Sequence, residues 1–340
     1  MTNDEMTVLM IAAEGEPMLP IGRWEKPIRD LETRGLMRNH DGISYFITDK
    51  GIYALKAENA QRDGEFANAL KAHRHQEDMI HVRMIVFCRQ IEFDLTYDPN
   101  FVQDVNTVAC LRRYGCCEPE VVQLMRRVIR PGDFVIDGGT SIGFMTLVMS
   151  RLVGEQGHVE AFEPSTLNFN KLRDNLALNN IENVAIVNRA LWSEDTQVDL
   201  HQALDSGSSS LMSFDGVLNR IPVGGLTLDK WCLAHYQAPR FLKLDIGGAE
   251  LHALIGAGAM LTRGIDFISC GMNIEALSRF GTTQIDLRDY MAGKGYSTFL
   301  MTDNGERPVM VSREQAVLPD KPNLNILFST VDKVHEAWNE

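Results

Sequence analysis

The sequence predicts an α/β protein in which a doubly wound, mainly parallel seven-stranded sheet follows a small α+β module. From residue 134 onward, apolar runs of strand length alternate with amphipathic helical stretches, which is typical of a parallel sheet covered on both faces. Before residue 79, the chain carries short helical patterns, one alternating run and a long polar stretch. We therefore expect a module over 1–60, a helical linker over 61–78 and the sheet domain over 79–335.

Composition restricts the class of protein. A net charge of -13 over 340 residues argues against broad contact with nucleic acid or an anionic membrane. The six cysteines have no zinc-like spacing, so no metal site is expected. The N-terminus "MTNDEM" lacks the positive region of a signal peptide, and no apolar run approaches the ~18 residues that cross a bilayer. These features predict a cytoplasmic protein that does not contact membranes.

The first sixty residues resemble a winged helix-turn-helix module. Two helical patterns, "EMTVLMIAAEG" and "EKPIRDLETRGLM", precede an alternating run, "ISYFITDKGIYALKAE", that turns at "DKG". Residues 1–75 contain ten Lys+Arg and twelve Asp+Glu, a net charge of 10 − 12 = −2, so no electrostatic footprint for DNA is visible. We expect this module to dock a protein partner or to form a homodimer.

The larger domain is expected to begin with two strands, "MIHVRMIVFC" and "IEFDLTYD", which precede its main sheet. The last two strands of the sheet follow each other without a helix between them, so one is expected to be antiparallel. Seven strands are predicted at "FVIDGG", "HVEAFEP", "NVAIVNRAL", "FLKLDI", "DFISCG", "STFLMT" and "NILFST", with helices over 143–153 and 165–179, through "AELHALIGAGAML" and over 283–292.

The loop after the first of these strands indicates a ligand that is not a phosphate. Thr140 stands where the dinucleotide pattern G-x-G-x-x-G requires its second glycine, and the Gly-Lys-Ser/Thr of a Walker loop is missing. What remains is Asp-x-Gly-x-x-x-Gly, with Asp137 closing the strand. An acid at that point repels phosphate and suits a ligand with an ammonium or sulfonium group.

A second acid supports the same ligand class. Glu163 ends the next strand, 163 − 137 = 26 positions after Asp137, where a carboxylate can accept hydrogen bonds from both ribose hydroxyls. A nucleoside with a cationic amino acid describes S-adenosylmethionine. Incidental glycines and a surface glutamate would explain either feature alone, but the two together at this spacing favour the cofactor site.

Several blocks over residues 112–330 resemble the FkbM-type methyltransferases, a group of Rossmann-like, class I adenosylmethionine-dependent enzymes. The blocks are "GCCEPEVVQLMRRVIRPGDFVIDGGTSIGFMTL", "AFEPSTLNFNKLRDNLALN", "LTLDKW" and "FLKLDIGGAELHALIGA". The resemblance implies that Glu163 holds the ribose and that Glu118 closes over the cofactor. It further implies contacts of Asp137, Gly139, Thr140, Ser141 and Gly143 with the methionine part, of Pro164 and Ser165 with the adenine, and of Asn188, Ala190 and Leu191 with the adenine edge.

The resemblance also implies methyl transfer to oxygen, with a hydroxyl of a small molecule or a glycan-like compound as acceptor. Asp245 ends the fourth strand and is the first choice for the general base, with His252 the second. Lys243 and Glu250 are expected to position the substrate, although a salt-bridged pair that only frames the strand end is an equal alternative. The Ser/Gly-rich stretch 201–216 suggests a mobile flap over the substrate.

The chain departs from the family pattern at three positions. Ser141 replaces the usual Asn, Gly247 replaces the Glu of "K-I-D-V-E-G", and Gly271 replaces an acid at the end of the fifth strand, where Glu275 could compensate. The acceptor is then unusual, or the domain is a non-catalytic adenosylmethionine-binding regulator that docks a partner or DNA through its N-terminal module. A third alternative, a nucleic-acid methyltransferase, lacks an Asn-Pro-Pro-Tyr-like clamp and a basic cleft.

Overall fold

The chain divides into two units, residues 1–78 and 79–340. The computed structural model describes residues 34, 37–39, 45–47, 82–88, 91–97, 102–202, 210–212, 219–232, 238–312 and 323–339. In the first unit, β1 (Met37–Asn39) pairs with β2 (Tyr45–Ile47) in antiparallel register. β2 lies in the predicted alternating run, whereas Met37 of β1 is the last residue of the second predicted helical pattern. Apart from Arg34 and Met37, the predicted helices and the "DKG" turn lie outside the described residues, so the winged-helix module and the boundaries 1–60, 61–78 and 79–335 stay predictions.

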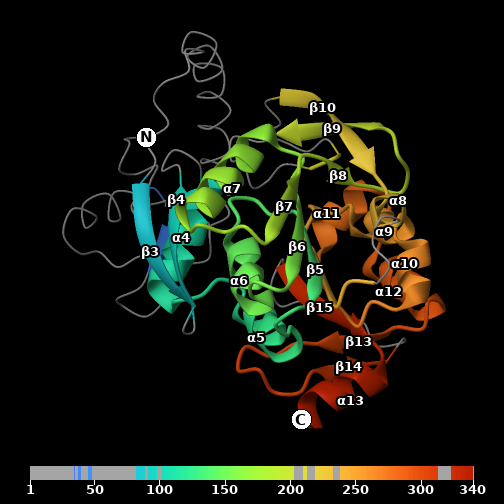
Figure 1. The fold of residues 1–340 in the computed structure, drawn as a ribbon. Coiled ribbons are helices and arrows are strands. Elements are labelled where there is room, and N and C mark those ends of the chain that lie inside the picture. The colour runs from blue at the N-terminus through green and yellow to red at the C-terminus, as the bar shows by residue number, and fades with distance from the viewer. Residues whose placement is uncertain are drawn as a thin grey trace. The chain divides into compact units, whose positions relative to one another are not determined.

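An eight-stranded mixed sheet forms the centre of the second unit (Figure 1). Its strand order is β14-β13-β15-β12-β11-β5-β6-β7, with parallel pairing from β7 to β12. The expected antiparallel strand is β15, which pairs antiparallel with both of its neighbours. The strands are β5 (Phe134–Gly138), β6 (His158–Phe162), β7 (Val184–Val187), β11 (Phe241–Leu244), β12 (Phe267–Asn273), β13 (Ser297–Leu300), β14 (Val309–Val311) and β15 (Asn323–Ser329).

The sheet was predicted to have seven strands and has eight; the strand that was missed is the edge strand β14. This strand has only three residues, and two of them, Val309 and Met310, are 60% and 56% exposed. An edge strand that is so short and so little buried has no alternation of polar and apolar residues that would identify it in the sequence.

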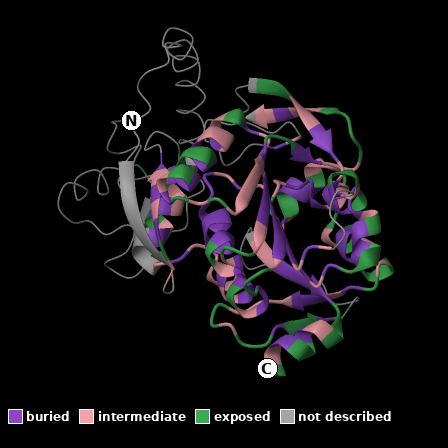
Figure 2. Cartoon of the chain, in the orientation of Figure 1, coloured by how far each residue is buried: buried purple, intermediate pink, exposed green. Residues whose placement is uncertain are grey.

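Helices cover both faces of the sheet and bury two separate hydrophobic cores (Figure 2). Alternate residues of one strand enter different cores; for example, Val135 packs into one core and Ile136 into the other. The first core is covered by α5 (Pro119–Val128), α6 (Phe144–Val153), α7 (Thr166–Leu178) and α13 (Val331–Asn339), and the second by α9 (Glu250–Ile255), α10 (Gly258–Arg263), α11 (Ile274–Arg279) and α12 (Gln284–Gly293).

The predicted helix through "AELHALIGAGAML" is divided into α9 and α10. Gly256 lies between them and packs against the backbone of Trp192, where a Cβ atom would be 2.0 Å from the Trp192 carbonyl oxygen. The helix α11 was not predicted. The predicted third strand, 183–191, is divided: its first part is β7, and its last two residues form the separate strand β8 (Ala190–Leu191). β8 belongs to a three-stranded sheet with β10 (Asn219–Leu226) and β9 (Gln197–Gln202). The short helix α8 (Leu228–Trp231) follows β10.

The two strands predicted before the main domain form a hairpin. They are β3 (Val82–Cys88) and β4 (Ile91–Tyr97), and α4 (Val102–Tyr114) follows. A fully buried ion pair of 2.5 Å between Lys171 Nζ of α7 and Asp104 Oδ2 of α4 joins these elements to the sheet domain. The hairpin and α4 are therefore held on the same face of the sheet as α7.

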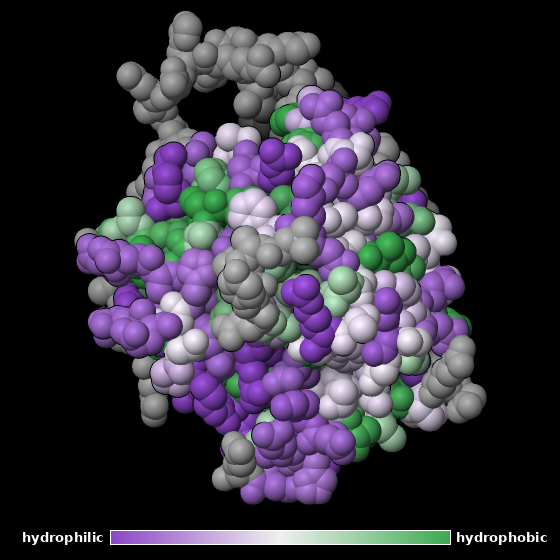
Figure 3. Space-filling model, turned by 45° about the vertical axis from the view of Figure 1, so that its right-hand side comes forward, coloured by the Kyte–Doolittle hydropathy of each residue, from purple (hydrophilic) through white to green (hydrophobic). Residues whose placement is uncertain are grey.

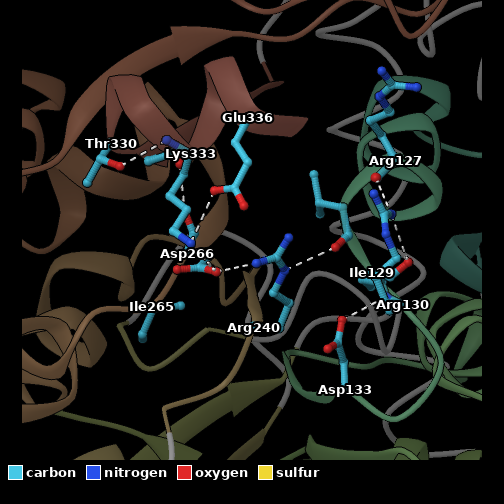
Figure 4. A network of polar contacts seen from close by, with 12 residues as sticks. Arg127, Ile129, Arg130, Asp133, Arg240, Ile265, Asp266, Thr330, Lys333 and Glu336 are labelled. Atoms are coloured by element: carbon cyan, nitrogen blue, oxygen red, sulfur yellow. Dashed lines mark hydrogen bonds and ion pairs between the residues drawn. The ribbon is translucent and has the colours of Figure 1, made fainter. Parts of the chain in front are cut away.

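Polar contacts join the amino ends of the central strands (Figure 4). Arg240, directly before β11, donates to the Val128 carbonyl at 3.2 Å and forms an ion pair with Asp266, directly before β12. Lys333 of α13 lies 3.5 Å from the same Asp266 carboxylate. This network stabilises the sheet at the edge opposite the carboxyl ends of its parallel strands.

None of the helices in the described part of the chain has the length and apolar character that crossing a membrane requires. On the face of the molecule shown in Figure 3, apolar side chains lie in small separate patches among polar ones.

Replacing Lys171 by Met should lower the free energy of unfolding by about 3–5 kcal/mol, because Asp104 would keep a buried charge without its cation. The double change Lys171→Met with Asp104→Leu should recover most of that loss. Urea denaturation measures both. Arg173→Ala, which removes an exposed ion pair with Asp174, is the control. Equal loss in the single and double variants would contradict this account.

Candidate functional site

The predicted site residues lie at the carboxyl ends of three neighbouring parallel strands, β6, β5 and β11. Asp137 and Lys243 are aligned partners on β5 and β11, and both side chains are buried, with residue exposures of 0% and 3%. In-register residues of neighbouring parallel strands face the same side of the sheet. The two side chains therefore share the face that α6 covers.

The loop from β5 to α6 depends on backbone conformations that side chains disfavour. Gly139 has φ +81°, and a Cβ atom there would lie 2.0 Å from the Asp245 carbonyl oxygen. Gly143 has φ +96° and begins α6. Ser141 has φ +50°, in the left-handed region that Asn enters more readily than other non-glycine residues, which gives a physical reason for the Asn that the family pattern has at this position.

Glu163, the predicted ribose residue, joins this loop to the start of α7. Its Oε2 accepts a hydrogen bond from the Ser141 amide and its Oε1 one from the Ser165 amide, both at 2.9 Å. Burial raises the pKa of Glu163 to about 7, although the two backbone hydrogen bonds act in the opposite direction. The Asn168 side chain also hydrogen-bonds Glu163 and lowers its pKa. Since a carboxylate has about four lone-pair sites, Glu163 can still accept a ribose hydroxyl without losing these contacts.

The residues predicted to contact the adenine lie next to Glu163 in the structure. Asn188 Nδ2 donates to the carbonyls of Glu163 at 2.8 Å and Pro164 at 3.1 Å, which fixes the turn after β7 against the loop after β6. Ala190 and Leu191 are buried, and Leu191 packs against Gly138. The residues assigned to ribose and adenine are thus contiguous in space.

Two buried oxygen atoms at the loop suit a ligand that donates hydrogen bonds. Asp137 Oδ2 accepts from Thr146 Oγ1 at 2.6 Å, whereas Asp137 Oδ1 and Thr140 Oγ1 are buried with no hydrogen-bond partner among the described residues. Buried polar atoms are rarely left unpaired. Burial raises the pKa of Asp137, and the Lys243 charge and the Thr146 hydrogen bond oppose that rise. An ammonium group would satisfy both oxygens.

Lys243 is a buried cation surrounded by carboxylates. Burial lowers its pKa, but the charges of Asp245, Glu118 and Asp137 raise it, and the net direction is upward. Its Nζ lies 3.5 Å from Asp245 Oδ2. Lys243 therefore pairs with Asp245, and the alternative of a Lys243–Glu250 salt bridge was wrong.

Glu118, which precedes α5, belongs to the same electrostatic cluster. It has φ +46°, and burial raises its pKa to about 7 while Lys243 opposes the rise. Asn325 Nδ2 on β15 lies 3.5 Å from Glu118 Oε2 and 2.8 Å from Glu120 Oε1. A residue 19 positions before Asp137 in the sequence (137 − 118 = 19) is thus brought to the strand ends.

The acceptor side differs most from the sequence-based expectation. The Asp245 side chain is 48% exposed, whereas Glu250 is buried and accepts hydrogen bonds from the amides of Ile246 at 3.0 Å and Gly248 at 3.3 Å. Burial raises the pKa of Glu250 to about 7. Glu250 thus fixes the loop after β11 and forms no hydrogen bond or ion pair with Lys243 or Asp245.

Gly271 lies directly beside Asp245, since a Cβ atom on Gly271 would be 3.0 Å from Asp245 Oδ1. Glu275 pairs with Arg279 at 2.8 Å with a side chain 80% exposed, so it does not replace the missing acid. His252 stacks on Trp192 with a ring distance of 4.1 Å, and burial lowers its pKa.

Sequence reasoning missed two residues of the site. Thr146, which fixes Asp137, lies in the block "GFMTL" on which the family resemblance rests, so a signal was present. Ser210 comes from the predicted flap 201–216, of which 203–209 and 213–216 lie outside the described residues. Its Oγ donates to the Gly247 carbonyl at 3.1 Å, a contact that no local pattern indicates.

The described residues contain no group of three or more His, Cys, Asp or Glu side chains that could hold a metal ion. A cleft of about 580 Å³ lies at the three-stranded sheet of β8, β10 and β9. It adjoins the predicted adenine edge through Arg189, which lies between Asn188 and Ala190, but none of the residues named as site residues lines it. Its lining residues include Arg189, Asp195, Lys230 and Trp231.

Residues 137–298 match the family model described as the methyltransferase FkbM domain. A search of curated proteins found no match. Similar solved structures include methyltransferase FkbM from Methylobacillus flagellatus KT (18% identity, TM-score 0.39, 68% of this chain and 55% of that chain). A second is an O-methyltransferase from Thermotoga maritima (14% identity, TM-score 0.36, 73% of this chain and 77% of that chain). A third is an rRNA methylase from Streptococcus thermophilus (10% identity, TM-score 0.36, 62% of this chain and 93% of that chain). This chain spans about half the length of the M. flagellatus protein.

Glu163→Ala and Asp137→Ala should each weaken binding of S-adenosylmethionine at least about tenfold, because each removes a charged acceptor of ligand hydrogen bonds. Isothermal titration calorimetry measures the affinity. Glu155→Ala, an exposed acid on the same domain, should bind as the wild type does. Wild-type affinity in both site variants would mean that the cofactor pocket lies elsewhere.

The ligand-free protein should lose stability as pH rises from about 5 to about 8. Glu118, Glu163 and Glu250 have pKa values of about 7 in the folded protein against an ordinary 4.5, so the folded state binds more protons than the unfolded state between these values. Their contribution is complete below 4.5 and is lost as pH passes about 7. Urea midpoints measured across this range should fall, and the fall should be smaller in Glu163→Gln with Glu250→Gln. A rising midpoint would contradict this prediction.

Proposed function

We propose that this chain, whose residues 137–298 form an S-adenosylmethionine-dependent methyltransferase domain of the FkbM family, methylates a hydroxyl oxygen of a small-molecule or glycan-like acceptor. The observation that carries the proposal is the position of Asp245. Its carboxylate is half exposed at the end of β11, and its backbone amide donates to the Gly138 carbonyl at 3.0 Å, so a candidate base adjoins the cofactor loop.

The described residues fit the cofactor at both of its ends. The unpaired oxygens of Asp137 and Thr140 would accept hydrogen bonds from the amino group, and Glu163 would accept them from the ribose hydroxyls. When bound, S-adenosylmethionine supplies a methyl group on a positively charged sulfur. The backbone contacts of Glu163 with Ser141 and Ser165 hold its carboxylate in place before the ligand arrives, which reduces the cost of ordering it.

A hydroxyl acceptor requires removal of its proton as the oxygen–carbon bond forms. Asp245 would accept that proton on a carboxylate oxygen. Lys243 Nζ, 3.5 Å from Asp245 Oδ2, orients the carboxylate from the buried side, so that the other oxygen can face the acceptor. The roles of Lys243 and Glu250 are then indirect: one orients the base, and the other fixes the loop over residues 246–248.

The two glycines at the acceptor side support a bulky acceptor. A Cβ atom added at Gly271 would lie 3.0 Å from Asp245 Oδ1, so a glutamate at this position would fill the space beside the carboxylate. Gly247 has φ +66°, a conformation that suits glycine and strains other residues. Because glycines replace larger side chains next to the proposed base, there is room for a bulky acceptor there. This favours an acceptor whose hydroxyl is carried on a ring, as in a sugar.

A direct test combines the purified protein, S-adenosylmethionine with a ¹³C-labelled methyl group, and a panel of hydroxylated small molecules and oligosaccharides. We expect release of S-adenosylhomocysteine together with a ¹³C methyl ether, detected by NMR and mass spectrometry. A methyl group recovered on nitrogen or carbon would contradict O-methylation. Tight cofactor binding with no release of S-adenosylhomocysteine from any acceptor would instead favour a non-catalytic regulator.

Asp245→Asn should lower kcat about 100-fold or more and leave the affinity for S-adenosylmethionine near the wild-type value, since the amide cannot accept the proton. Steady-state kinetics and calorimetry on the same preparation separate the two effects. Glu275→Gln, which changes an exposed acid paired with Arg279, is the control and should keep full activity. An unchanged kcat in Asp245→Asn would remove this residue from the mechanism.

A further inference from the structure

We propose that Asn175 is a positioning residue that connects the β3–β4 hairpin to the cofactor loop and thereby sets cofactor affinity. The inference rests on the proposed function only in taking residues 137–143 as the cofactor loop. Asn175 lies on α7 with a fully buried side chain. Its amide contacts two segments that are distant in the sequence, β4 and the loop before α6.

The contact with β4 belongs to a pair of matching contacts. Asn175 Oδ1 accepts from the Thr96 amide at 2.7 Å and its Nδ2 donates to the Thr96 carbonyl at 3.1 Å. Asn179 does the same with Asp94, at 2.8 Å and 2.7 Å. Each side-chain amide thus takes the place of a peptide group of a neighbouring strand, with one donor and one acceptor.

The spacing of the two elements explains why the pair fits. Asn175 and Asn179 are four residues apart on one helix face, a rise of about 6 Å, and Asp94 and Thr96 are two residues apart on a strand, a rise of about 6.7 Å. The edge of β4 is therefore hydrogen-bonded by a helix instead of a strand. Both asparagines bond β4 through one donor and one acceptor. The second bond of Asn179 Nδ2 goes to the Asn175 carbonyl at 2.7 Å and not to the loop, which makes Asn179 a matched reference.

Of these two asparagines, Asn175 alone donates a hydrogen bond to the cofactor loop. Its Nδ2 also donates to the Ile142 carbonyl at 2.8 Å. Ile142 lies between Ser141 and Gly143, which both have positive φ. The Ser141 amide in turn donates to Glu163 Oε2 at 2.9 Å. A continuous set of hydrogen bonds and backbone therefore runs from Thr96 through Asn175 and the loop to the ribose-binding carboxylate.

These hydrogen bonds hold the loop in a strained conformation at Ser141. Ser141 has φ +50°, a left-handed conformation that strains residues other than glycine. Fixing the next carbonyl opposes relaxation of the loop, and the loop positions the Ser141 amide on Glu163. Loss of the Asn175 amide should therefore loosen the loop, whereas loss of the Asn179 amide should loosen only the hairpin.

The experiment compares Asn175→Ala with Asn179→Ala in the full chain by two measurements. The first is S-adenosylmethionine affinity by calorimetry. We expect a loss of about tenfold for Asn175→Ala and near wild-type affinity for Asn179→Ala. The second is hydrogen exchange in the ligand-free protein. Amides of residues 139–143 should exchange faster in Asn175→Ala alone, and those of β4 should exchange faster in both variants.

Two further variants keep the test informative if an alanine variant folds poorly. Asn175→Asp and Asn179→Asp retain the acceptor oxygen for the strand amide but lose the donor, so only the first should affect residues 139–143. Equal effects of the 175 and 179 variants on affinity and on loop exchange would overturn the inference. If the wild type does not bind S-adenosylmethionine, the proposed function fails, and loop exchange alone decides whether Asn175 positions the loop.

Discussion

The close approach of the β5–α6 loop to the end of β11 is the constraint on which the site depends. At Gly139 the loop backbone lies against the Asp245 carbonyl, where a Cβ atom would be only 2.0 Å away, and the Asp245 amide donates to the Gly138 carbonyl at 3.0 Å. Any side chain at position 139 would separate the two backbones. Because they touch, the predicted cofactor loop and the residue proposed as base form one surface, and a methyl donor and an acceptor bound there would need no large movement to meet.

The electrostatics of the strand ends complement a cationic ligand. Lys243 is buried among Asp137, Asp245 and Glu118, so acidic groups outnumber it. Burial raises the pKa values of Glu118 and Glu163 to about 7, which means that negative charge in the ligand-free site is unfavourable. A sulfonium and an ammonium group would relieve that charge. The same excess of acids repels phosphates, in agreement with the absence of both phosphate-binding glycine patterns from the loop sequence.

Local sequence patterns predicted which acids end neighbouring strands, and the structure brings these acids to one edge of the sheet. Asp137, Glu163 and Asp245 each close an apolar strand, and parallel strands bring such positions to one edge. Contacts between distant segments were not predictable in this way. Asn175 and Thr96 are 79 residues apart, and nothing near either of them indicates the other. The pairing of Lys243 with Asp245 and the separate role of Glu250 depend on how the loop after β11 folds back on itself. The edge strand β14 is too short and exposed to leave a pattern.

In the proposed complex, Glu163 and Asp245 lie on opposite sides of one bound adenosyl ligand. The most direct measurement is an experimental structure of the protein with S-adenosylhomocysteine, compared with that of the ligand-free protein. We expect ribose hydroxyls hydrogen-bonded to Glu163, the amino group on Asp137 and Thr140, and the sulfur facing Asp245 across Gly139. An adenosyl group bound elsewhere, with no ribose hydroxyl on Glu163, would contradict this arrangement.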